Sequence, residues 1–202
     1  MNDRQFLWGL SSGVSVFAIA GAFWFGLGIS ALPRRAGWLI FAPATVVQVG
    51  GCAALLWAAA RLRRKSRFRA SELLQIDDRR KAETRHIRAG FVWTTVGQTV
   101  LIGSAVFWCV RAHLEQMIWP SIGLVVSLHL VPLAKIFHVR AYYFTAGAGS
   151  IISLVAFSGL TDPYGLIYLG GGMAAVMWVS AAYLLSNADR IAGRALREPW
   201  TV

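Results

Sequence analysis

Three polar side chains stand at similar depths within long apolar stretches of the chain. The sequence is 56% hydrophobic and only 14% charged, and polar groups inside a membrane usually face the interior of a helix bundle or a cavity. At about 1.5 Å of helical rise per residue, His129, Gln98 and Gln48 lie roughly 12, 14 and 18 Å from the ends of their stretches that face the same side of the membrane. Thr95 lies one turn before Gln98. We therefore predict one ligand pocket formed by Gln48, Thr95, Gln98 and His129.

Pro132, one turn after His129, strengthens this prediction. Proline has no N–H, so the carbonyl of Leu128 loses its helical partner and can join the imidazole in a polar pocket. The same side chains also fit a simpler interpretation, because Gln and His often hydrogen-bond between membrane helices and stabilise them by about 0.6 kcal/mol on average. The sequence therefore leaves two interpretations open: a site for a ligand or an ion, and hydrogen bonds that hold the helices together.

Other chemistry finds less support in the sequence. A metal site or a bis-histidine haem needs several ligands at one depth, whereas the remaining histidines fall at other depths than His129, namely His86, His113 and His138. No acidic residue lies within an apolar stretch to orient His129 as a catalytic base. We therefore expect no metal, no cofactor and no enzymatic activity.

The elements that must position these residues are membrane helices. About 20 apolar residues cross a bilayer core of about 30 Å, and inside lipid the backbone must bond within its own segment, which favours helices. The apolar blocks are residues 6–32, 37–60, 89–111, 117–137, 141–160 and 164–186. The sequence thus predicts an all-α fold, an integral membrane bundle of six transmembrane helices that forms a single domain over residues 1–202.

The distribution of positive charge predicts the orientation of this bundle. The net charge is +11, and cytoplasmic segments of membrane proteins carry an excess of Lys and Arg. With six spans and a cytoplasmic N-terminus, 17 of the 20 basic residues fall inside. This explains the charge without nucleic-acid binding. The Arg-rich, Ala-rich composition is typical of a GC-rich bacterium, so we expect a multi-pass protein of the bacterial inner membrane with both termini cytoplasmic.

The inner basic residues are the expected contacts with the lipid bilayer. They concentrate in a loop, residues 61–88, and a cytoplasmic tail, residues 187–202. Lys135 lies near the end of its helix, where its long side chain reaches the headgroups. The predicted headgroup or topology anchors are Arg61, Arg63, Arg64, Lys135 and Arg140. Glycine pairs such as Gly9 and Gly13 are also compatible with a homo-oligomer.

A short segment of the chain resembles a known group of proteins. The segment contains His129, Pro132, Leu133, Ala134, Phe137, Tyr142 and Tyr143. It is similar to a segment of small bacterial six-helix membrane proteins of unknown function, over about 20 residues. The resemblance implies a fold and no activity. Two hypotheses follow from the sequence: a small transporter-like or ligand-binding bundle, or a non-transporting scaffold that binds a partner through its basic loop.

Overall fold

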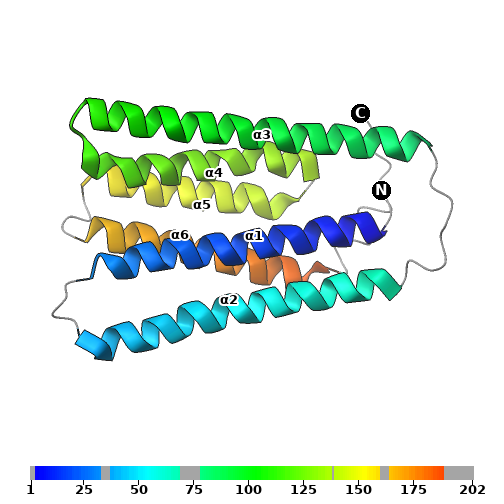
Figure 1. Ribbon diagram of the computed structural model, residues 1–202, viewed down its shortest axis with the longest axis horizontal. Helices are drawn as coiled ribbons and strands as arrows, with labels where there is room; N and C mark the ends of the chain where they lie inside the picture. The colour runs from blue at the N-terminus through cyan, green and yellow to red at the C-terminus, as the bar shows by residue number, and fades with distance from the viewer. Residues whose placement is uncertain (1–2, 33–36, 69–77, 138, 160–163, 189–202) are drawn as a thin grey trace.

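The computed structural model describes residues 3–32, 37–68, 78–137, 139–159 and 164–188 (Figure 1). Within these ranges the chain is helical, with no strand, so the all-α prediction is confirmed. The elements are α1 (Asp3–Ser30), α2 (Gly37–Phe68), α3 (Asp78–Arg111), the short 3-10 helix η3 (Glu115–Met117), α4 (Ile118–Phe137), α5 (Arg140–Phe157) and α6 (Gly165–Ser186).

Five of these helices are long and apolar enough to cross a membrane. The spans lie at Gly13–Ser30, Ala42–Arg61, Ala89–Arg111, Glu115–Phe137 and Gly165–Ser186. The sixth predicted span, residues 141–160, corresponds to α5, which is shorter and more polar. It begins at Arg140 and contains two tyrosines, a threonine and two glycines in its first ten residues. By length and composition, five of the described helices could therefore cross a membrane.

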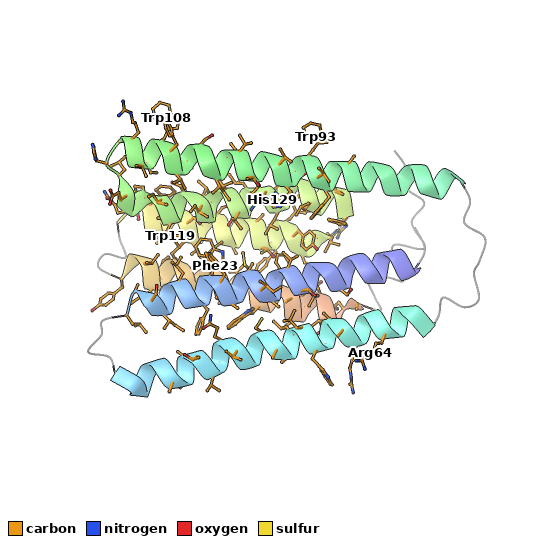
Figure 2. The ribbon with its side chains drawn as sticks, in the orientation of Figure 1. Phe23, Arg64, Trp93, Trp108, Trp119 and His129 are labelled. Atoms are coloured by element: carbon orange, nitrogen blue, oxygen red, sulfur yellow. The ribbon has the colours of Figure 1, made fainter. Side chains whose placement is uncertain are left out.

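The six long helices form an open row. α1 packs against α2 and α6, α6 packs against α5, α5 against α4, and α4 against α3. The order across the molecule is therefore α2, α1, α6, α5, α4, α3, and Figure 1 shows α2 and α3 at opposite sides. In the described parts of the chain these two flanking helices do not pack on each other. Their outer faces are apolar and exposed, as Trp93 and Trp108 of α3 show by pointing away from the bundle (Figure 2).

The core lies within α1, α4, α5 and α6. Trp24 of α1 is only 2% exposed, and the buried side chains of α6 include Leu169, Met173 and Leu184. α1 also reaches α4, because the rings of Phe23 and Trp119 have centroids 6.4 Å apart (Figure 2).

Small residues let α1 and α6 touch backbone to backbone. A Cβ atom added at Gly170 would lie 2.5 Å from the backbone nitrogen of Gly28 and 2.5 Å from the carbonyl oxygen of Trp24. Such small faces are a common means of close packing between membrane helices. The indole of Trp178 adds a polar link, since its Nε1 donates to the carbonyl of Ala18 at 3.3 Å. These contacts make α1 and α6 the central pair of the fold.

Six helix termini lie together at one end of the molecule, which we call the basic end. It comprises the starts of α1, α3 and α5 and the ends of α2, α4 and α6, all on one side of Figure 1. Part of the predicted basic loop is helical there, because α2 continues past its span to Phe68 and α3 starts at Asp78, well before Ala89. Residues 69–77 and most of the tail 187–202 lie outside the described residues.

Candidate functional site

Gln48, on α2, bonds to the neighbouring helix. Its Nε2 donates a hydrogen bond of 2.8 Å to the carbonyl oxygen of Ala22 on α1. Gly26, one turn further along α1, leaves room for this amide, because a Cβ there would lie 2.9 Å from Nε2. The contact is the bond between helices that the sequence left open as the simpler interpretation. It lies on the side of the row away from α3 and α4.

His129 lies between α3 and α4, midway along the bundle (Figure 2). The side chain is half-buried, and its ring faces the main chain of Thr94 on α3. Its Nδ1 atom is buried and has no hydrogen-bond partner. Among the side chains that the structure describes, this is the one buried nitrogen or oxygen atom without a partner. A ligand group that donates a hydrogen bond to Nδ1 would give this atom the partner it lacks.

Gln98 shares this interface with His129. It lies on α3 one turn beyond Thr94, on the helix face that is half-buried against α4. The Thr94 hydroxyl is already engaged, since it donates to the carbonyl of Gly90 at 2.7 Å. The Gln98 amide has no hydrogen-bond partner among the residues that the structure describes. For the buried Nδ1 atom of His129, the lack of a partner in an apolar medium costs about 2–7 kcal/mol, depending on the reference state.

Thr95 does not belong to this interface. Its side chain is exposed on α3, and its Oγ1 donates to the carbonyl of Phe91 within the same helix at 2.9 Å. Pro132 is likewise exposed on α4, and the helix continues through it to Phe137. Thr95 therefore adds no polar group to the space beside His129. The polar site that remains consists of Gln98, His129 and the main chain of Thr94.

The structure therefore separates the four predicted pocket residues. Gln98 and His129 lie on helices that pack together, whereas Gln48 lies on α2, which packs against α1, and donates its hydrogen bond there. Their similar depths gave no information about their order across the bundle. We call the α3–α4 interface that contains Gln98 and His129 the polar seam.

The polar seam is the main attachment of α3 to the rest of the protein. At the basic end, Gly90 of α3 lies close to the side chain of Ile136. At the other end, the Cys109 sulfur lies 3.7 Å from the Ser121 hydroxyl. No residue in the span of α3 is fully buried. The seam is thus long, narrow and held by few side chains.

The basic end carries the predicted anchors. Arg61, Arg64, Lys135 and Arg140 are all exposed, and none of the four forms an ion pair with a described residue. Arg63 lies on α2, with its side chain outside the described residues. The Arg61 guanidinium lies 4.1 Å from the centroid of the Trp57 ring. This cation–π pair was not predicted from the sequence, although its spacing of four residues on a helix could have indicated it.

Metal chemistry and known proteins give no further identification. The described residues contain no group of three His, Cys, Asp or Glu side chains that could hold a metal ion. No family model, no curated protein and no solved structure matches the chain. The function must therefore be argued from the polar seam and the basic end.

Proposed function

We propose that the chain is a six-span membrane protein that binds a small polar molecule at the polar seam. The observation that carries this proposal is the buried, unpartnered Nδ1 atom of His129, with the unpartnered Gln98 amide on the facing helix. Buried polar groups in membranes are expected to find partners, since lipid offers none. A ligand with a hydrogen-bond donor satisfies the imidazole, and Gln98 can both donate and accept.

The sixth span in this proposal is α5. It packs against α4 and α6, which are both long and apolar enough to cross a membrane. Its polar groups are engaged within the bundle, since the Thr145 hydroxyl lies 2.6 Å from the Ser180 hydroxyl of α6. A helix enclosed in this way tolerates more polar residues than one that faces lipid.

The proposed orientation has the basic end in the cytoplasm of a bacterium. Six antiparallel spans bring the start of α1 and the end of α6 to the same side. That side has the arginine-rich extensions of α2 and α3, and cytoplasmic flanks attract such charge. The polar seam then lies within the membrane, and α3 is the helix most easily displaced from it. This arrangement suits a transporter-like or ligand-binding protein.

Native mass spectrometry of the detergent-released protein tests the seam. We expect wild type to retain a small-molecule adduct, and His129→Leu and Gln98→Leu to lose it. The matched control is Gln48→Leu, which removes a polar side chain at comparable depth on α2 and should keep the adduct. An adduct retained by His129→Leu, or a wild type that never carries one under any release condition, would rule out the ligand site.

A second candidate function is a scaffold that binds a protein through the basic end. The observation in its favour is that α2 and α3 extend beyond their spans as helices, so the backbone of these arginine-rich segments is ordered as helix. Replacing the basic residues of 79–88 with Gln, while topology is preserved, should then remove partners captured by crosslinking in cells. Unchanged crosslinked partners would exclude this candidate and leave the seam proposal intact.

A further inference from the structure

Three side chains form one face at the basic end of α2. Trp57, Arg61 and Arg64 are spaced by four and three residues, which places them along the same side of a helix. The Arg61 guanidinium lies 4.1 Å from the Trp57 ring centroid, and this ring is 60% exposed. Arg64 is exposed and points away from the bundle (Figure 2). The face is therefore turned toward the surroundings of the protein.

This face lies where the apolar span gives way to charge. The span of α2 ends at Arg61, and the helix continues as far as Phe68. Tryptophan favours the boundary between lipid and water because its ring is apolar and its N–H is polar. With Trp57 at that boundary, Arg61 and Arg64 lie at the level of the lipid headgroups. The ring also holds the Arg61 guanidinium in place, which lowers the entropy lost when an anion binds.

Among the residues that the structure describes, the two arginines have no anionic partner. Neither forms an ion pair with a described residue, and the helix from Arg61 to its end contains no Asp or Glu. A guanidinium presents several N–H donors in a planar fork that matches phosphate oxygens. Two guanidinium groups one turn apart can therefore bind the same phosphate group.

An apolar strip continues this face into the membrane. Val46, Gly50 and Ala53 precede Trp57 at helical spacing and are all exposed. A Cβ atom added at Gly50 would meet nothing within 4 Å. The strip is shallow at Gly50 because no side chain projects there. Its length from Val46 to Trp57 is about 17 Å, which accommodates most of one leaflet of the hydrocarbon core.

We propose that this face binds one anionic phospholipid. The phosphate lies between Arg61 and Arg64, the glycerol region lies over Trp57, and one acyl chain follows Val46, Gly50 and Ala53. A zwitterionic lipid supplies the same acyl chain, but its choline group repels the two arginines. The proposal needs α2 to span a membrane and is independent of any ligand at the polar seam.

Lipid retention measured by native mass spectrometry tests the inference. The full chain is equilibrated with phosphatidylglycerol or with phosphatidylcholine in the same detergent. We expect phosphatidylglycerol to bind wild type preferentially and Arg61→Gln/Arg64→Gln to bind it roughly 10-fold or more weakly, because each Lys or Arg near an anionic surface contributes about 1 kcal/mol. The matched control is Arg111→Gln, an exposed arginine at the opposite end of α3, which should bind like wild type.

A second variant keeps the test decisive if the double substitution destabilises the fold. Trp57→Leu retains both charges and an apolar side chain, and we expect it to weaken phosphatidylglycerol binding by a smaller factor. Equal binding of the two lipids to wild type would overturn the inference. So would an Arg61→Gln/Arg64→Gln protein that keeps its lipid, or an equal loss caused by Arg111→Gln, because binding would then follow net charge and not this face.

Discussion

At the residue scale, the polar side chains of the bundle differ in whether the protein itself satisfies them. Gln48 donates to Ala22, and the Thr95 hydroxyl bonds to its own helix. The buried Nδ1 of His129 has no such partner. The satisfied groups stabilise the fold, whereas the unsatisfied atom carries a free-energy cost that a ligand can remove. This difference yields two predictions with opposite signs.

Gln48→Ala should destabilise the protein modestly. The variant loses one hydrogen bond between α2 and α1, which in membrane proteins contributes about 0.6 kcal/mol on average. The free energy of unfolding in mixed detergent micelles measures the effect. Thr95→Val is the control, because it removes an exposed hydroxyl that bonds only within α3. An equal loss of unfolding free energy in both variants would mean that the hydrogen bond to Ala22 does not contribute specifically to stability.

His129→Leu should leave the stability of ligand-free protein unchanged or raise it. Replacing an unpartnered buried acceptor by an apolar group removes its desolvation penalty of about 1–3 kcal/mol, which offsets the lost packing. Thermal unfolding of protein stripped of small molecules by extensive washing measures this. A marked destabilisation would show that the imidazole is a structural group and would count against the seam as a ligand site.

Depth was predictable from the sequence for these residues, and lateral position was not. The helical rise predicts similar positions along the spans for Gln98 and His129, and these two residues lie on adjacent helices. The rise says nothing of which helices are neighbours. Gln48 was assigned to the same pocket because only its distance along the helix was known. The partner of α2 is set by the shape of α1, which a single sequence does not reveal.

At the element scale, the pairing of α1 with α6 depends on glycine. A Cβ at Gly170 would meet the backbone of Gly28, which cannot move aside as a flexible side chain can. The adjacent Gly171 has no neighbour within 4 Å of such an atom. A substitution at Gly170 therefore tests the close packing of α1 on α6, whereas the same substitution at Gly171 tests only helix propensity.

Gly170→Ala should destabilise the protein, and Gly171→Ala should not. Overpacking typically costs about 1–3 kcal/mol, whereas alanine in an unobstructed helical position gains roughly 0.5–1 kcal/mol over glycine. Chemical unfolding of both variants in the same detergent gives the comparison. Equal stability of the two variants would contradict the close approach of α1 and α6.

The extensions of α2 and α3 were harder to foresee than the apolar blocks. Apolar runs identify what can lie in lipid, and five of the six expected spans correspond to helices of that kind. The same criterion ends a span at the first cluster of charges, although Arg and Lys are good helix formers. The helices therefore continue to Phe68 and begin at Asp78, within the connecting segment 61–88.

At the scale of the whole molecule, the concentration of positive charge at one end should set the orientation. In a background with both native cysteines replaced by serine, a cysteine at Leu114 should react with a membrane-impermeant thiol reagent from outside intact cells. A cysteine at Ser186 should react only after lysis. These positions lie at opposite ends of the molecule. The reverse labelling pattern would place the basic end outside the cell.

The central pairing of α1 with α6 has a consequence for biosynthesis. These are the first and last of the long helices in the chain, and they form the most extensive pair in the bundle. During translation α2 to α5 are made before α6, so Gly28 of α1 lacks throughout that interval the helix that it contacts in the folded protein. A chain whose synthesis stops before α6 lacks the α1–α6 pair at the centre of the fold. Such incomplete chains should be preferred substrates for membrane quality-control proteases.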